Sequence, residues 1–501
     1  MKHLHRITVL YLTIPFIIFC MGWLRLSVAI PAAAIILWAL WQLLKQPPAD
    51  HSTHHASRIT FYVLLITALW TLLSGVGGYA FQNWDHHWRN AVLHDLISFD
   101  WPVFYSQPES GPVKMLVYYI GYWLPSAGIG KLLGWQAANF ALFLWTWLGV
   151  VLVTLHFASV LKTSPIKAIL LLIFFSGLDI LGTLFFAREY PTLFPPITHL
   201  EIWSGNLQYS SFTTQLFWVF NQAVPAWLCI VLILESDGSS PVEKHAPAFQ
   251  KIFIWSLCFF FAPLASIGLL PYLLIGLIKQ TDFKSPFKNF HWDILLAAVI
   301  IFLLSSFFFT SNTAAQQRGF QFLDLKDFLA FFLLEGGILW LLLAPIKWRD
   351  PNWMVTGVLL AVIPFIQLGS GDDFVMRASI APLFHLLLMT GEIIFQKKVP
   401  RLLLITYYLL LLIGSLTSLY EINRSVYRTF DYYFVQDESE CECEVPPVVT
   451  HLEQGVAPEA EHPGTLTADE IVTLKFMDDQ LSKNFIANVR QSLYYRYISS
   501  R

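Results

Sequence analysis

Apolar residues occupy most of the chain in a series of runs, each about 20 residues long, between residues 7 and 420. A run of this length spans the hydrocarbon core of a bilayer as a helix. Helices are favoured over strands because every backbone polar group in hydrocarbon must be satisfied within the segment. The pattern predicts about thirteen spans, at residues 7–24, 26–44, 58–80, 137–161, 166–185, 212–234, 252–263, 265–279, 292–310, 328–346, 353–370, 379–396 and 399–420.

This pattern predicts an all-α polytopic membrane protein in three parts. Residues 1–57 hold two transmembrane helices and a cytoplasmic loop, residues 58–420 form the main transmembrane domain, and residues 421–501 form an acidic tail. In the tail, Thr467 and Glu470 stand at capping-box spacing before a helical apolar pattern. We expect one or two short helices there, docked on the outer face.

Lysine and arginine residues indicate the sidedness. With the N-terminus in the cytoplasm and 113–134 as a surface helix, the basic residues collect in one alternate set of loops. The other set contains the long polar loops 81–136, 180–211, 311–327 and 371–378. We therefore expect a multi-pass protein of the inner or plasma membrane, with a cytoplasmic N-terminus and an extracytoplasmic tail.

The composition limits the classes of partner that the protein is expected to bind. The 501 residues are 56% hydrophobic and 13% charged, with a net charge of −3, and no basic stripe with interleaved aromatics is present, which argues against nucleic acid. Five cysteines do not form a disulfide framework. Cys441 and Cys443 make a Cys-x-Cys pair in the tail, too few residues to support a metal site or a disulfide to a partner.

The first external loop, WDHHWRNAVLHD, carries the leading candidate for catalysis. Asp85 follows the span at 58–80, and Arg89 stands four residues later on the same helical face. Ionisable residues at a membrane boundary are costly and are therefore functional candidates. Asp85 is suited to act as a general base or to position a substrate. A solvated interfacial loop without chemistry is the alternative, and the histidine spacing matches no standard metal pattern.

The other external loops supply further candidates. Asp179 lies between Gly177 and Gly182, which suggests close approach of backbone or ligand, although an Asp that caps a short helix is as common. An Arg at the outer membrane edge is a natural partner for a phosphate, or else closes an ion pair with a nearby Asp. The remaining polar or stacking candidates for substrate binding are His199, Glu201, Tyr209, Gln316, Arg318, Asp372 and Arg377.

The arrangement resembles the GT-C superfamily of membrane glycosyltransferases, which includes oligosaccharyltransferase catalytic subunits, protein O-mannosyltransferases and the lipid A aminoarabinose transferase. Asp85 and the predicted helices near 86–97 and 113–134 match that superfamily's first external loop. The segment PVKMLVYYIGYWLPSAGIGKLLG is similar to its Pro–Tyr-Tyr surface helix, and Asp179 matches a second acidic residue. The chain has single acidic residues where some members have pairs, so no motif supports a divalent metal.

The resemblance implies an enzyme that transfers a sugar from a polyprenyl-phosphate donor to an acceptor on the extracytoplasmic face. The acceptor would be a lipid, a glycan or a protein. Asp85 would be the base, Arg377 or Arg318 would stabilise the departing phosphate, and Asp179 would orient the acceptor or a metal. The alternative is a transporter or flippase for a lipid-linked saccharide, which predicts polar residues within spans. A polysaccharide polymerase or ligase is a third alternative, disfavoured by the few external arginines.

Overall fold

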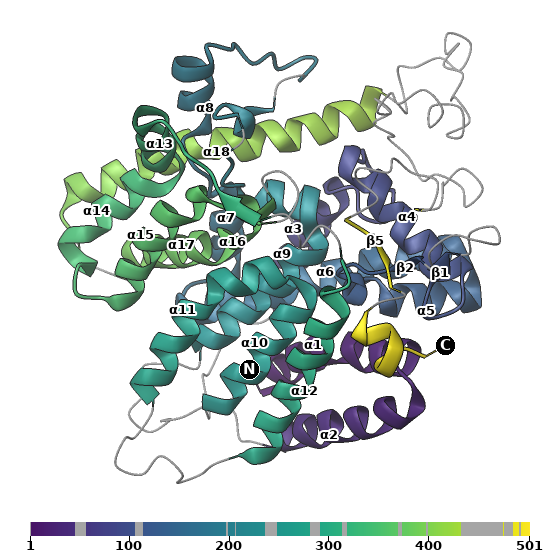
Figure 1. The fold of residues 1–501 in the computed structure, drawn as a ribbon. Coiled ribbons are helices and arrows are strands. Elements are labelled where there is room, and N and C mark those ends of the chain that lie inside the picture. Colours follow the sequence, from purple (N-terminus) through teal and green to yellow (C-terminus); the bar gives the residue numbers. More distant parts are fainter. Residues whose placement is uncertain are drawn as a thin grey trace, which may run out of the picture.

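The structure is a computed structural model that describes residues 2–45, 57–105, 114–196, 199–205, 207–235, 248–280, 291–312, 318–368, 373–396, 399–431, 474, 484–489 and 492–500. It is built almost entirely of helices (Figure 1). The first half contains α1 (Lys2–Trp23), α2 (Leu26–Lys45), α3 (Ser57–Leu73), α4 (Trp84–Ser98), η1 (Ile120–Tyr122), α5 (Leu124–Leu133), α6 (Trp135–Val160), α7 (Pro165–Phe174), α8 (Asp179–Gly182), η2 (Thr183–Ala187), η3 (Leu200–Ile202) and α9 (Phe212–Glu235). The second half contains α10 (Ala248–Phe261), α11 (Pro263–Gln280), α12 (Trp292–Phe309), α13 (Leu325–Phe332), η5 (Leu333–Gly337), α14 (Ile338–Lys347), α15 (Pro351–Val362), η6 (Ile363–Phe365), α16 (Asp373–Ala378), α17 (Ile380–Phe395), α18 (Arg401–Phe430) and η10 (Tyr494–Ile498).

Among the described residues, nine helical segments are long and apolar enough to cross a membrane. They are His3–Trp23, Leu26–Lys45, Trp135–Val160, Pro165–Ala187, Phe212–Leu234, Trp292–Phe309, Leu325–Lys347, Asp373–Phe395 and Arg401–Phe430. Four further apolar helices are shorter, at Phe61–Leu73, Ala248–Phe261, Pro263–Lys279 and Pro351–Phe365. The protein is thus a multi-pass, almost all-helical protein suited to a lipid bilayer.

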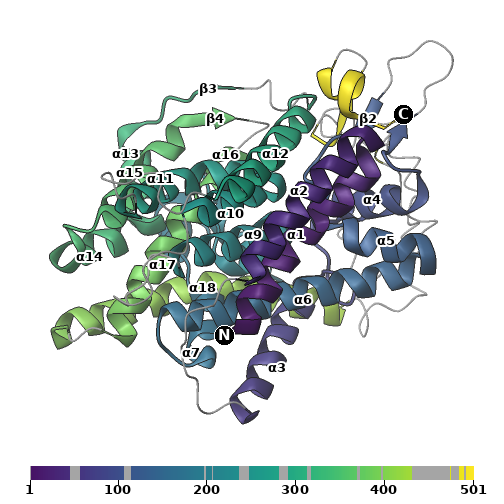
Figure 2. The ribbon, with the colours of Figure 1, turned by 90° about the horizontal axis from the view of Figure 1, so that it is seen from below.

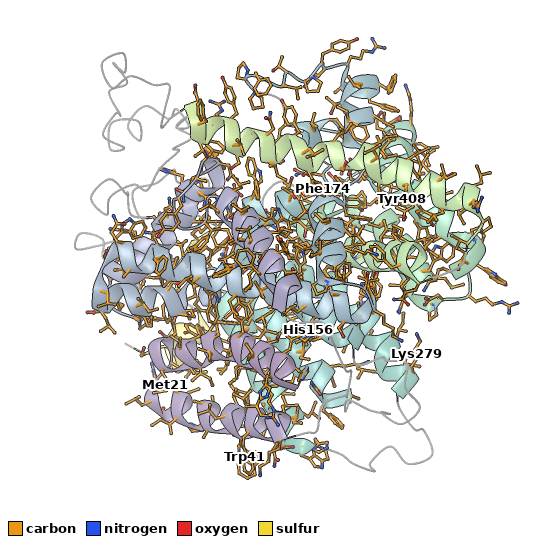
Figure 3. All side chains as sticks on the ribbon, turned by 180° about the vertical axis from the view of Figure 1, so that it is seen from behind. Met21, Trp41, His156, Phe174, Lys279 and Tyr408 are labelled. Atoms are coloured by element: carbon orange, nitrogen blue, oxygen red, sulfur yellow. The ribbon has the colours of Figure 1, made fainter. Side chains whose placement is uncertain are left out.

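Large apolar side chains are exposed on the outward faces of these helices. Met21 of α1, Trp41 of α2 and Tyr408 of α18 are each about half exposed and lie at the edge of the helical assembly (Figure 3). A water-facing surface would disfavour such residues, whereas lipid tails accommodate them. The helices α1 and α2 pack side by side and also contact α10 and α12 respectively (Figure 2), so the N-terminal pair adjoins the rest of the bundle.

Two of the long apolar segments are interrupted. In Pro165–Ala187 the helix stops at Phe174, and the chain resumes as a short helix at Asp179. In Leu325–Lys347 a π-helical turn over Leu333–Gly337 separates α13 from α14. The backbones meet where the Leu178 amide donates to the Leu334 carbonyl at 2.9 Å. Both interruptions therefore occur at the same place, and each carries a carboxylate.

Short strands join the first external loop to the end of the chain. The strand β2 (Lys114–Leu116) pairs antiparallel with β1 (Phe104–Tyr105) on one side and with β5 (Ile486–Asn488) on the other (Figure 1). In register, Met115 lies opposite Phe104 and Ala487. A second pair joins β3 (Arg318–Phe320) to β4 (Ile366–Leu368). One or two short helices were expected in the tail, and its described residues contain the strand β5 and the short helix η10. Thr467 and Glu470, which carried the capping-box prediction, lie outside the described residues.

The surface helix expected over 113–134 is shorter than predicted. Residues 114–116 form β2, and α5 covers only Leu124–Leu133. Pro125 at the start of α5 lacks an amide that the first turn would leave unpaired, and Gly134 ends the helix with a φ of 86°. The helix expected near 86–97 is confirmed as α4.

Hydrogen bonds between helices show which helix ends lie together at each end of the bundle. His5 bonds Gln250 at 2.7 Å, Thr8 bonds His156 at 2.8 Å, and these join the starts of α1 and α10 to the end of α6. At the other end, Arg25 donates to the Ser499 carbonyl at 2.9 Å. The α1–α2 corner, the loop that follows α3 and the chain end therefore share one face, which we call the loop face.

Candidate functional site: two buried polar clusters at the loop face

Asp85 lies in the first turn of α4. The Asn83 side chain begins the helix by accepting the Asp85 amide at 3.1 Å, and an acidic residue in a first turn is favoured by the helix dipole. One turn later, the Arg89 guanidinium donates to the Asp85 carboxylate at 2.9 Å. The Arg89 side chain is only 6% exposed, whereas that of Asp85 is 25% exposed. Asp85 and Arg89 were predicted to share a helical face, and in the structure they form an ion pair on it.

Arg89 also contacts α9. Its Nε donates to Asn221 Oδ1 at 3.4 Å, and its guanidinium lies 5.8 Å from the Phe220 ring centre. The chain of α9 departs from helical geometry at Val219, and Pro225 in the same helix cannot donate a backbone hydrogen bond to residue 221. Within the described structure, Arg89 Nη1 and Asn221 Nδ2 are buried without a hydrogen-bond partner.

A second ion pair lies on α16. The Arg377 guanidinium is 3.5 Å from the Asp373 carboxylate, four residues earlier on the same helix. Arg377 is 8% exposed, and within the described residues its Nε has no hydrogen-bond partner. The pairing of an Arg with an Asp four residues before it matches the ion-pair alternative considered for this loop. It still leaves one donor of Arg377 unused.

The two ion pairs face one tyrosine. Burial raises the pKa of the Tyr118 hydroxyl, the charges of Arg89 and Arg377 lower it, and those of Asp373 and Asp85 raise it. All four charges therefore lie within electrostatic reach of a single buried hydroxyl. We call these five residues the paired-charge cluster. It brings together three residues predicted from the sequence: Asp85, Arg89 and Arg377.

The end of the chain forms part of the wall beside this cluster. The Phe485 ring stacks on Trp88 with centroids 5.3 Å apart and planes 5° apart, and its centroid is 4.4 Å from that of Tyr118. The Val117 amide donates to the Phe485 carbonyl at 2.8 Å. Asn312 fixes both segments by donating to the carbonyls of Val117 and Asn484. Residues about 370 positions apart thus hold Tyr118 in place.

A second cluster contains three buried carboxyl groups, and we call it the carboxyl cluster: Asp179, Glu201 and Glu335. Asp179 accepts hydrogen bonds from Ser176 at 2.9 Å and from Thr417 at 3.0 Å. Glu335 accepts the Trp203 indole N–H at 2.7 Å. Asp179 Oδ1 and Glu335 Oε2 are buried, and neither has a hydrogen-bond partner among the described residues. Two neighbouring buried carboxyl groups favour a shared proton over two negative charges.

The glycines beside Asp179 allow this close packing. A Cβ on Gly177 would lie 2.6 Å from Glu335 Oε2, and one on Gly182 would overlap the Trp203 ring. The sequence predicted close approach of backbone or ligand at these positions, and the close neighbours are two side chains of the protein itself. Larger residues here would push Glu335 and Trp203 away.

Glu201 is held by neutral donors. Its carboxyl group accepts Gln208 Nε2 at 2.7 Å, the Ser211 amide at 2.9 Å and the Thr214 hydroxyl at 2.7 Å. Burial, with the nearby charge of Asp179, raises the pKa of Glu201 from 4.5 to about 8. A protonated Glu201 is therefore the prevailing form at neutral pH.

A bridge of mixed charge lies between the two clusters. Glu421 on α18 is 3.5 Å from His199 and 3.7 Å from Arg424, and the three residues lie close to Trp218. Burial lowers the pKa of His199, while the charges of Glu421 and Asp85 raise it. Asp85 therefore influences His199 as well as Tyr118. Glu421 and Arg424 also line a small recess with Leu73, Ser74, Phe81, Asn83, Phe217 and Ser425.

The remaining predicted residues lie elsewhere. Tyr209 is buried and donates to the Leu360 carbonyl at 2.7 Å, so it ties the 199–211 loop to α15. Arg318 is exposed on β3, outside both clusters. Gln316 and Asp372 lie outside the described residues. In the part of the chain that the structure describes, no group of three or more His, Cys, Asp or Glu side chains is arranged to hold a metal ion.

Sequence reasoning missed Tyr118, Glu335 and Phe485. Tyr118 stands in the Tyr-Tyr segment that supported the family resemblance, and Glu335 is an isolated carboxylate within an apolar run. Each could therefore have been chosen as a candidate from the sequence. Phe485 had none, because its role depends on pairing between distant strands. Comparison with family models, with curated proteins and with solved structures found no match for this chain.

Proposed function

We propose that the protein is a membrane glycosyltransferase that takes a sugar from a polyprenyl-phosphate donor, with the paired-charge cluster as its reaction site. The observation that supports this most strongly is that two buried arginines, Arg89 and Arg377, each pair with a carboxylate four residues earlier, and that the charges of both act on the Tyr118 hydroxyl. Each retains a buried N–H without a partner among the described residues. Guanidinium groups bind phosphate oxygens through paired hydrogen bonds, so this site is suited to the phosphate of such a donor.

The proposed reaction uses the neighbouring carboxylate. Asp85 accepts the proton of an acceptor hydroxyl, and the oxygen of that hydroxyl bonds to the anomeric carbon of the sugar. The bond between that carbon and the phosphate oxygen breaks, and its electron pair stays on the prenyl phosphate. Arg377 and Arg89 stabilise the charge on this leaving group, which is where preorganised donors contribute most to catalysis. The prenyl chain extends into the bilayer beside the helices.

Asp179 has a different part in this proposal from the one the sequence suggested. It belongs to the carboxyl cluster, where Ser176 and Thr417 donate hydrogen bonds to it. Through Glu335, Trp203 and the 199–211 loop it positions His199 near Asp85. We therefore assign it a positioning role without a metal.

A transporter of lipid-linked saccharides is the second candidate, and one observation favours it. Glu335 lies near the middle of Leu325–Lys347, where the helix is interrupted. Interrupted helices with intramembrane carboxylates are common at transporter substrate sites. Within the described residues, however, the buried atoms without a partner in the carboxyl cluster are the acceptors Asp179 Oδ1 and Glu335 Oε2. Those in the paired-charge cluster are the donors Arg89 Nη1 and Arg377 Nε, which suit an anionic group.

Lipid and glycan profiling of a deletion strain separates the two. A transferase predicts accumulation of one prenyl-phosphate sugar on the extracytoplasmic leaflet and loss of one sugar from a glycan, lipid or protein. A transporter predicts accumulation of the lipid-linked saccharide on the cytoplasmic leaflet. A strain that loses no sugar modification would contradict the transferase proposal.

A further inference from the structure

Asp85 is bound to a cation in the free protein. Its carboxylate takes a hydrogen bond from Arg89 at 2.9 Å, and the helical spacing of four residues holds the two together. The oxygen that Arg89 holds is not open to the hydroxyl of an acceptor. In this arrangement Asp85 is engaged by Arg89 rather than by a substrate.

The Arg89 guanidinium, by contrast, can still donate a hydrogen bond to a ligand. Within the described residues, its Nη1 is buried without a partner, and so is Asn221 Nδ2 on the helix that Arg89 contacts. Arg377 Nε is likewise buried without a partner among the described residues, and the charges of both arginines lower the pKa of Tyr118. Buried donors without acceptors are rare because they lose their bonds to water. An anion with several oxygens would satisfy Arg89 Nη1 and Asn221 Nδ2 together, because these two side chains already contact each other at 3.4 Å.

We propose that a lipid-borne phosphate group displaces the Asp85 carboxylate from Arg89, so that binding of the donor releases the base. Arg89 then holds phosphate oxygens together with Arg377 and the Asn221 amide, and the Asp85 carboxylate turns to its solvent-exposed side. This inference rests on the proposed function only in taking the phosphate to be that of the donor. It couples the two halves of the site, because the Asp85 carboxylate is released to the acceptor hydroxyl only when a phosphate is in place.

The exchange makes an unusual prediction for Asp85→Asn. Asparagine competes for Arg89 less strongly than a carboxylate, so the variant should bind a prenyl phosphate more tightly while it loses the base. The full-length protein in detergent is titrated with geranyl phosphate, a sugar-free prenyl phosphate, and binding is followed by thermophoresis. We expect the dissociation constant of D85N to be about fivefold lower than that of the wild type, the scale of one partly exposed ion pair.

The controls isolate the exchange. Asp350→Asn makes the same change in an acid that pairs with Lys347 at 3.3 Å, outside both clusters, and should leave the dissociation constant unchanged. Arg89→Gln should raise it. Asp85→Ser repeats the D85N test with a second side chain, and thermal unfolding verifies that each variant is folded. Inorganic phosphate should bind more weakly than geranyl phosphate, whereas equal affinity would assign the site to a free anion and overturn the lipid-linked part.

The two proposals fail in different ways. Unchanged or weaker binding of geranyl phosphate by both folded variants, D85N and D85S, overturns the exchange, even if D85N also abolishes sugar transfer. Tighter binding supports the exchange. If the deletion strain then lacks no sugar modification, the exchange stands and the transferase proposal falls.

Discussion

The two clusters bury ionisable groups in opposite ways. In the paired-charge cluster, carboxylates meet guanidinium groups, at 2.9 Å between Asp85 and Arg89 and at 3.5 Å between Asp373 and Arg377. In the carboxyl cluster, the hydrogen bonds that the described residues make to Asp179, Glu201 and Glu335 come from neutral hydroxyl, amide and indole donors. The first cluster compensates charge with charge, and the second cluster removes charge by holding protons.

The difference indicates which cluster can take up a ligand. Buried carboxyl groups offer a ligand acceptors more than donors, so the carboxyl cluster does not suit an anion and is suited to joining the interrupted helices. Ion pairs can exchange partners, and both arginines retain N–H groups that no described residue uses. We therefore expect substitutions in the paired-charge cluster to change activity and substitutions in the carboxyl cluster to change stability.

The largest effect is expected for Asp85→Asn. Loss of a general base typically slows a reaction by about 100- to 10,000-fold, while the asparagine still accepts a bond from Arg89. Sugar modification should therefore disappear in a deletion strain that carries D85N and return in one that carries D350N. Normal modification with D85N would remove the proposed base.

Arg377→Gln is expected to follow, with a rate lowered by about 100- to 1,000-fold through loss of one stabilising donor for the leaving phosphate. Arg377→Lys should recover part of the rate, because it keeps the charge but not the planar fork. Initial rates of transfer with the donor identified by profiling provide the measurement. Equal rates for all three proteins would place the phosphate elsewhere.

Phe485→Ala should lower the rate by about tenfold, because a small displacement of Tyr118 and Arg89 is sufficient to misalign the reacting groups. Phe485→Tyr keeps the ring and should act nearly as the wild type. The matched control is Tyr495→Ala, which removes the ring that contacts Phe104 at 5.8 Å in the same terminal segment. If Y495A lowered the rate as much as F485A, general docking of the segment would explain the effect.

The smallest effect on activity is expected for Glu201→Gln, which should act on stability. Because the pKa of Glu201 is raised in the folded protein, the native state holds a proton that the unfolded state releases above pH 4.5. Wild-type stability should thus fall as the pH rises from 4.5 to about 8 and level off above that. The glutamine of Glu201→Gln is uncharged at every pH and so resembles protonated Glu201.

Thermal unfolding of E201Q and the wild type across this range tests the sign. The curve of E201Q should be flatter, and E201Q should be the more stable protein at pH 8 and above. A parallel pair of curves would mean that Glu201 is ionised in the folded protein.

The sequence was most informative where one physical effect dominates. The apolar runs placed α1, α2, α6 and α9 within a few residues, since burial in lipid sets both length and composition. The span expected at 399–420 continues to Phe430, because Arg424 and Ser425, past the apolar run, still pack against Phe81, Trp218 and Leu73. Asp85 and Arg89 could be paired from their spacing alone.

Features that depend on tertiary contacts were not predictable. The break at Glu335 arises because the backbone of Leu334 bonds that of Leu178, and no local pattern specifies this. The pairing of β5 with β2 joins segments more than 350 residues apart, so neither strand carries a signal of its own. The meeting of Arg89 with Arg377 likewise depends on how α4 and α16 lie around Tyr118.

The position of a bound prenyl phosphate tests the central claim most directly. A cryo-electron microscopy structure of the full chain with geranyl phosphate should show the phosphate between Arg89 and Arg377, within hydrogen-bond distance of both, with Asp85 no longer bonded to Arg89. A phosphate that contacts neither arginine, or one that binds at the carboxyl cluster, would contradict the account.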